Sequence, residues 1–171
     1  YGGANNRALS NQNANVFLIL NPDIEFIERG TVKKLYDRLY QKDKVAVVGP
    51  RLETSEGKTQ KWDHGGANFL RQPVFSEWKE RFVPTDVNWV SGAVFGILAD
   101  IFREVEGFDE RFFLYHEELD LCLRILKLGK RIVYDPELTV KHIGSVSTNR
   151  GEELKKSTPK LVEKYYSHRF F

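Results

Sequence analysis

Two continuous apolar runs constrain the fold of this chain more than any other feature of its sequence. Residues 15–20 read NVFLIL and residues 44–50 read KVAVVGP. Runs that are apolar on both faces are typical of buried strands in a parallel sheet. Between them, the apolar and aromatic residues of 30–42 recur at i, i+3, i+4, i+7 and i+8, the spacing of an amphipathic helix. Strand, helix and strand in this order predict a right-handed crossover unit, and therefore an α/β sheet.

The remaining segments continue this alternation. The predicted helices are 4–14, 100–106 and about 117–128, and the predicted strands are 87–98, 131–135 and 138–142, with a connector at 107–113. Gly129 supplies the stop of the last helix. The sequence TSEGK predicts a hairpin turn, within an irregular segment 51–85 whose length is typical of a functional or a disordered loop.

Length and composition limit the classes of protein that this chain can represent. With 171 residues and 41% apolar content, it is large enough for one domain with a core. A formal charge of +2 provides no broad field for nucleic acid or an anionic membrane. The single cysteine, Cys122, excludes an internal disulfide and fits a reducing compartment. The most apolar segments are too short or too interrupted for the ~20 residues of a spanning helix.

The motif NPD places Asn21 and Asp23 at the predicted carboxyl end of a buried strand. Ligands bind at this edge in open α/β sheets. A carboxylate oxygen with an amide oxygen two residues away suits a hard divalent cation that also holds phosphate oxygens. Asn, Pro and Asp are also turn formers, so a plain turn explains the motif too. Both interpretations stay open on these residues alone.

Three carboxylates, Glu117, Glu118 and Asp120, fall within four positions at the start of the predicted helix. Acidic residues favour a first helical turn because they oppose the helix dipole, and each contributes roughly 0.3–1 kcal/mol. Asp120 can also pair with Arg124 at i, i+4. The alternative interpretation is that one of the carboxylates is a general base. Residue chemistry alone does not decide between a helix start and a catalytic group.

Four further side chains are weaker candidates. His142 ends a predicted strand just before IGS, and a lone histidine is more often packed or solvent-facing than a ligand. Trp62 and His64, in KWDHGGAN, fit the wall of a sugar pocket, because aromatic faces stack on the apolar faces of sugars. Cys122 lies on the predicted core face of its helix and is interpreted as packing.

Several segments, taken in order along the chain, carry a resemblance to a known family. They are YGGANNRAL, FLILNPD, VAVVGPRL, WVSGAVFGI, the stretch from VEGFDERFFLYHEELDLCLR to VKHIGS, and the terminal KYYSHRFF. Together they resemble the family 2 glycosyltransferases, in particular the rhamnosyltransferase-like branch, over nearly the whole chain. NPD alone is a weak match, whereas SGA, GFDERFFLY, LDLCLR and VKHIGSVS at these spacings form a strong one.

The resemblance implies a GT-A fold, which is an α/β fold with a mixed, mostly parallel sheet and flanking helices, here in a truncated version. It also implies a nucleotide-sugar donor, inversion at the anomeric carbon and a divalent metal, Mg2+ or Mn2+, on the donor diphosphate. Matched onto this chain, the metal residues are Asp23 and His142, and the catalytic pair is Glu117 and Glu118, with Glu118 as the base. The residues matched to donor or acceptor binding are Asn21, Trp89, Ser91, Gly92, Ala93, Trp62 and His64.

The chain departs from the family pattern in three ways. Glu118 stands where the family usually has Asp, and the extra methylene moves the carboxylate by about 1 Å. Asn21 replaces an acidic residue, which leaves one charged ligand in that motif. The chain has no methionine and starts after the nucleoside-binding strands of family members, so we expect a fragment. Its expected parts are 1–50 as the remainder of the nucleotide-binding half, 51–145 as the acceptor-side half, and 146–171 as a C-terminal tail.

The expected function is transfer of a sugar, such as rhamnose, from dTDP-rhamnose or a UDP-sugar to a glycan or lipid-linked acceptor in surface-polysaccharide synthesis. We expect a cytoplasmic protein at the inner face of the membrane, with the basic, aromatic tail KLVEKYYSHRFF as a peripheral contact. Exposed sheet edges favour homo-oligomers, and no nucleic-acid partner is expected. The competing interpretations are a non-catalytic sugar- or nucleotide-binding module derived from the same fold, and a generic α/β interaction domain.

Overall fold

The computed structural model describes residues 1–41, 44–60, 80–112 and 116–143. Among these residues, six strands form one sheet in the order β1-β5-β3-β6-β2, with β4 also paired to β6. The strands are β1 (Val16–Leu20), β2 (Ile24–Phe26), β3 (Val45–Glu53), β4 (Thr85–Asp86), β5 (Val94–Leu98) and β6 (Arg131–His142). The helices are α1 (Gly2–Leu9), α2 (Thr31–Gln41), α3 (Ala99–Glu104) and α4 (Glu117–Lys127).

The sheet is mixed, as predicted, but it has fewer parallel pairs among the described residues than we expected. β5 lies between β1 and β3 and runs antiparallel to both. β3 and β6 pair in parallel, whereas β2 and β4 each run antiparallel to β6. β1 and β3 therefore share a direction, as the crossover unit requires, without being neighbours. An apolar run indicates that a strand is buried, but not which way its neighbour runs.

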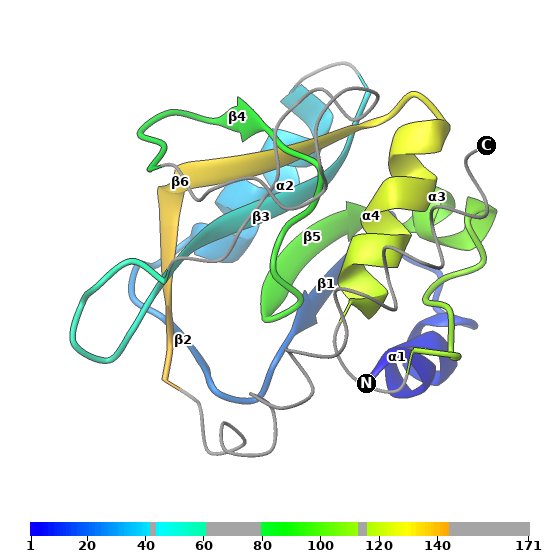
Figure 1. Cartoon of the computed structure of the whole chain (residues 1–171), viewed down its shortest axis with the longest axis horizontal. Coiled ribbons are helices and arrows are strands. Elements are labelled where there is room, and N and C mark those ends of the chain that lie inside the picture. Colours follow the sequence, from blue (N-terminus) through cyan, green and yellow to red (C-terminus); the bar gives the residue numbers. More distant parts are fainter. Residues whose placement is uncertain (42–43, 61–79, 113–115, 144–171) are drawn as a thin grey trace.

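Helices cover both faces of the sheet, which explains why its central strands are apolar on both sides. α4 lies in front of the sheet and α2 behind it (Figure 1). Val47 of β3 and Ile132 of β6 pack with the side chains of α3 and α4. Their neighbours Val48 and Val133 pack instead with the side chains of α2. Alternate residues of one strand thus enter different parts of the core, as a side-chain period of two requires.

Four strands differ from the predicted elements, and one of them, β4 (Thr85–Asp86), falls at the end of the segment predicted to be irregular. The predicted strands 131–135 and 138–142 are one strand, β6, whose pairing with β3 shifts register opposite Pro50 and Arg51 and then resumes. β5 begins at Val94 rather than at Val87, because residues 87–90 are buried without being in a strand and a turn follows them. β2 was not predicted, since three residues carry too little pattern to indicate a strand.

The helix and turn predictions nearest the candidate site are confirmed. α4 spans Glu117–Lys127, with its three acidic residues in the first turn. Gly129 follows the helix with a φ of 70°, the left-handed conformation that ends helices. The hairpin turn 54–58 closes through a hydrogen bond from the Thr54 N–H to the Lys58 carbonyl. In the described part of the chain, no helix has the length and apolar character needed to cross a membrane.

Candidate active site

The segment 91–93 is where several predicted site residues meet. It forms a turn just before β5, in which the Ala93 N–H donates to the Ser91 hydroxyl oxygen at 3.2 Å. The Asn21 N–H, directly after β1, donates to the Ala93 carbonyl at 2.8 Å. The Tyr1 hydroxyl donates to the Gly92 carbonyl at 2.6 Å. The chain therefore holds this turn from two sides, through residues that lie far from it in the sequence.

The Glu118 side chain packs against the same turn. A methyl group added to Gly92 would lie 3.5 Å from both the Cβ and the carboxyl carbon of Glu118, which is ordinary contact distance. The backbone of the turn and the Glu118 side chain are therefore direct neighbours. The first turn of α4 and the segment 91–93, which the sequence analysis matched to the same reaction, are brought together by the fold.

Glu117 and Glu118 form a pair of carboxyl groups with perturbed pKa values. Burial, and then the neighbouring charge of Glu117, raise the pKa of Glu118 to about 8, although nearby backbone N–H groups oppose the rise. Burial also raises the pKa of Glu117. The Oε2 atom of each residue is buried and has no hydrogen-bond partner among the described residues. At neutral pH the pair therefore holds a proton that a carboxyl group in water would have lost.

Asp23 and His142 lie side by side at the other end of the candidate site. The pairing of β2 with β6 places Ile24 opposite His142, and the Ile143 N–H donates to the Asp23 carbonyl at 2.9 Å. The Asp23 Oδ2 atom is 3.4 Å from the His142 Nε2 atom. The other carboxylate oxygen, Oδ1, is buried without a hydrogen-bond partner in the described part of the chain. The predicted metal residues are thus together.

The chemistry of this pair fits a divalent cation. A carboxylate with one unsatisfied buried oxygen and an imidazole nitrogen directed at the other oxygen offer two ligands of suitable type. Within the described ranges, no cluster of three or more His, Cys, Asp or Glu side chains has the arrangement of a metal site. Two protein ligands suffice where phosphate oxygens and water complete the coordination, as is common for Mg2+.

The other predicted residues fall into three groups. Trp89 is 7% exposed and belongs to the main core, so its ring packs against apolar side chains. Cys122 is buried in the same core, and Asp120 pairs with Arg124 at 2.7 Å, both as predicted. Trp62 and His64 lie outside the described residues. The tail 146–171 also lies outside them.

Two residues that contact the site were missed by the sequence analysis. Tyr1 reaches the 91–93 turn from the start of α1, and burial raises the pKa of its hydroxyl strongly. Gln60 follows the hairpin turn and hydrogen-bonds both the ring and the backbone carbonyl of His142. Tyr1 lies in the segment YGGANNRAL, which was used only for the family resemblance, and Gln60 lies in no matched segment; both contacts depend on how distant segments meet. For Gln60, the one feature visible in the sequence was its position just after a predicted hairpin turn.

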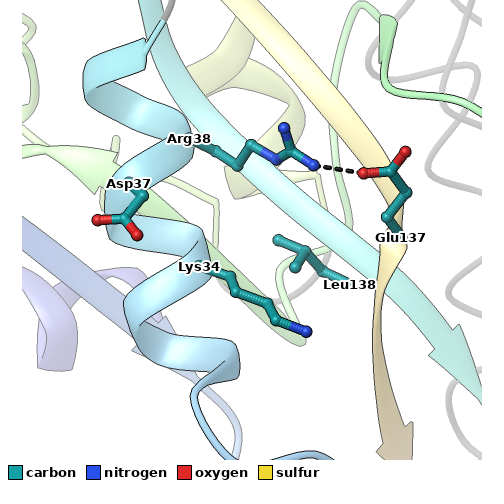
Figure 2. Close-up of a pocket in the computed structure, with 5 residues that line it drawn as sticks. All are labelled: Lys34, Asp37, Arg38, Glu137 and Leu138. Atoms are coloured by element: carbon teal, nitrogen blue, oxygen red, sulfur yellow. Dashed lines mark hydrogen bonds and ion pairs between the residues drawn. The ribbon is translucent and has the colours of Figure 1, made fainter.

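A separate pocket lies between α2 and β6 and is lined by none of the predicted site residues. Figure 2 shows its five lining side chains, which enclose about 310 Å³ and are Lys34, Asp37, Arg38, Glu137 and Leu138. Arg38 pairs with Glu137 and, at 2.8 Å, with the fully buried Asp135. Lys34 pairs with Glu28. The two Arg38 pairs tie α2 to β6. Arg38, Lys34 and Glu137 therefore already have charged partners within the protein.

Comparison with known proteins identifies the class of the chain. No family model matches it. Among solved structures, GalNAc-T7 with UDP, GalNAc and Mn2+ gives a TM-score of 0.63 at 17% identity, over 85% of this chain and 30% of that chain. The mannosyltransferase PcManGT from Pyrobaculum calidifontis, in complex with GDP-Man and Mn2+, gives 0.59 at 13% identity, over 91% and 40%. The fold is therefore a partial GT-A glycosyltransferase fold.

Curated relatives indicate which kind of glycosyltransferase this chain resembles. The N-acetylglucosaminyl-diphospho-decaprenol L-rhamnosyltransferase of Mycobacterium tuberculosis (strain CDC 1551 / Oshkosh) is 29% identical over 149 residues, or 78% of this chain and 48% of the relative. Rhamnosyltransferase WbbL of Escherichia coli (strain K12) is 38% identical over 58 residues, or 34% of this chain and 22% of the relative. The resemblance to rhamnosyltransferases is thus confirmed. The chain spans about half the length of the mycobacterial relative.

Proposed function

We propose that this chain is part of an inverting glycosyltransferase, which moves a sugar from a nucleotide-sugar donor to a hydroxyl group of a glycan or lipid-linked acceptor. The observation that carries the proposal is the meeting of three elements around the 91–93 turn. The Asn21 N–H and the Tyr1 hydroxyl both bond this turn, and Glu118 packs against it. Asp23 lies two residues beyond Asn21 and faces His142. In this proposal Asn21 and Glu118 adjoin one backbone segment, and the residues proposed to hold the donor diphosphate follow Asn21 in the chain or lie across the β2–β6 pairing.

Glu118 acts as the general base in this proposal. An acceptor hydroxyl loses its proton to the Glu118 carboxylate as its oxygen attacks the anomeric carbon, from the face opposite the leaving group. A base with a pKa of about 8 is a stronger proton acceptor than an ordinary glutamate, at the cost of a smaller ionised fraction at neutral pH. Glu117 keeps the pKa of its neighbour high by its charge.

Asp23 and His142 are the residues that would hold the donor diphosphate through a divalent cation. Such a cation supplies charge neutralisation for the departing nucleoside diphosphate. Asp23 Oδ1 and His142 Nε2 are the atoms suited to this contact, since the first has no partner in the described residues and the second faces Asp23. Asn21 contributes its backbone to the site, through the Ala93 carbonyl. We assign residues 1–50 to the remaining nucleotide side of the enzyme and residues 51–145 to the acceptor side, except that His142 at the end of β6 contributes to the nucleotide side.

The names of the relatives support a specific donor and acceptor. The mycobacterial relative is named for L-rhamnose and for a decaprenol-linked N-acetylglucosaminyl diphosphate. We therefore propose dTDP-rhamnose as the donor to test first, with a UDP-sugar as the second choice, and a polyprenol-linked sugar at the cytoplasmic face of a membrane as the acceptor.

The test measures release of nucleoside diphosphate from a panel of nucleotide sugars, with Mn2+ or Mg2+ and after chelation. It compares this chain with the full gene product that contains it, each also as Glu118→Gln and Asp23→Ala. The expected result is metal-dependent turnover that both substitutions abolish. Nucleotide binding without any metal-dependent turnover, in either form, would overturn the proposal and favour a non-catalytic binding module.

A further inference from the structure

Gln60 makes two hydrogen bonds to one residue of the candidate site. Its Nε2 donates to the His142 backbone carbonyl at 3.1 Å, and its Oε1 lies 3.0 Å from the His142 Nδ1. The Gln60 backbone is fixed as well, because its N–H donates to the Leu52 carbonyl at 2.8 Å. The chain leaves β3, reverses at the hairpin turn 54–58 and places Gln60 beside Leu52 of β3. The side-chain amide therefore links this segment to the end of β6.

These two bonds determine which ring nitrogen of His142 carries a proton. A backbone carbonyl only accepts hydrogen bonds, so the amide nitrogen of Gln60 must face it. The amide oxygen must then face Nδ1, and since that oxygen only accepts, Nδ1 must be the donor. This reasoning does not depend on which amide atom was assigned as oxygen. In a neutral ring with Nδ1–H, Nε2 carries the lone pair.

We propose that Gln60 is a positioning residue, which fixes the tautomer and the ring orientation of His142 so that Nε2 directs its lone pair at the Asp23 side of the site. Nε2 and the Asp23 Oδ2 lie 3.4 Å apart. Without a proton on Nε2, both atoms are electron-pair donors, and their approach is favourable when a cation lies between or beside them. A residue that holds the second nitrogen of a ligating histidine in this way also raises the basicity of the first.

This inference rests on the metal site in the proposed function, but its first readout needs neither metal nor activity. Long-range 1H–15N spectra of the imidazole report the tautomer of His142 directly, at a pH where the ring shifts show the neutral form. Gln60→Leu removes both hydrogen bonds. Gln60→Glu retains an acceptor for Nδ1–H and loses the donor to the carbonyl. Gln12→Leu is the matched control, because Gln12 is exposed and lies outside the site.

The expected spectra show Nδ1–H in the unchanged protein, in Gln60→Glu and in Gln12→Leu, and a shift toward the Nε2–H form in Gln60→Leu. Affinity for Mn2+ alone, measured by titration calorimetry, should fall 10- to 100-fold in Gln60→Leu and stay unchanged in Gln12→Leu. Circular dichroism and the amide spectrum check the fold. If Gln60→Leu does not fold, Gln60→Ala replaces it, because alanine also lacks both the donor and the acceptor.

Two results would overturn the inference. One is an Nε2–H ring in the unchanged protein, and the other is an Nδ1–H ring that persists in a folded Gln60 variant without the acceptor. Failure of the proposed function gives a different pattern. There, Gln60 still controls the tautomer of His142, as inferred, but the unchanged protein binds no Mn2+ and releases no nucleoside diphosphate.

Discussion

Replacement of Glu118 by Gln should stabilise the folded chain at alkaline pH and leave its stability nearly unchanged at acid pH. The folded state raises the pKa of Glu118 to about 8, chiefly because the carboxyl group is buried. Between the ordinary value and the raised one, the folded state binds a proton that the unfolded state has released. Stability conferred by that proton is present at low pH and is lost as pH rises through the folded value.

The expected change in the free energy of unfolding follows from the interval between the ordinary and the raised pKa of Glu118. Each pH unit across which one extra proton is bound changes the free energy of unfolding by about 1.4 kcal/mol. The interval from 4.5 to about 8 therefore corresponds to a loss on the order of 5 kcal/mol in the unchanged chain. Glutamine has no proton to lose, so Glu118→Gln escapes this loss. Glu117 shares the same buried environment, so its own titration also contributes to the pH dependence of both proteins.

Urea unfolding followed by circular dichroism, at intervals from pH 5 to pH 9, measures this difference. The quantity of interest is the free energy of unfolding of Glu118→Gln minus that of the unchanged chain. It should be small at pH 5 and grow to several kcal/mol by pH 9. Glu104→Gln, at an exposed position of α3, provides the control and should give a difference near zero throughout. A difference for Glu118→Gln that stays constant with pH would refute a buried, proton-binding carboxyl at this position.

Three further predictions concern activity and packing. The kcat/KM for transfer should rise about tenfold between pH 7 and pH 9, because the base titrates near 8, and a pH-independent profile would exclude Glu118 as the base. Gly49→Ala should lower stability by about 1–3 kcal/mol in urea unfolding, since its methyl would lie 2.6 Å from the buried Val90 Cβ. Asp120→Ala should cost about 3 kcal/mol, because it breaks a largely buried ion pair. Asp86→Ala, which breaks an exposed pair, should cost less than about 1 kcal/mol; equal costs would contradict this distinction.

Local sequence patterns were sufficient to predict the helices and strands that have a strong hydrophobic periodicity. The apolar run before Asn21 became β1, and the apolar face of 117–127 became α4 with its acidic first turn. The Asp120–Arg124 pair also followed from spacing alone, because residues four apart on a helix are neighbours. The match to known motifs then indicated which acidic residues and which short turn belong to one reaction. These inferences depend on neighbours in the sequence, or on the order of segments along it.

Contacts between distant segments were decided by the tertiary structure. The three residues of β2 carry too little pattern to predict a strand, yet their pairing with β6 is what brings Asp23 to His142. The same holds for the insertion of β5 between β1 and β3, which an apolar run does not reveal. Sheet register depends on which strands find each other in the folded chain.

The sequence by itself therefore determined the α/β class, the helix that begins at Glu117 and the set of residues worth suspecting. Only the tertiary structure decided that Glu118 packs against Gly92 and that Gln60 reaches His142. It also decided the protonation of the carboxyl pair, since burial sets the pKa and burial is a property of the packed chain. The physical reason is the distance along the chain over which each kind of information extends. A hydrophobic pattern depends on residues a few positions apart, whereas this site joins segments from the first residue to the end of β6.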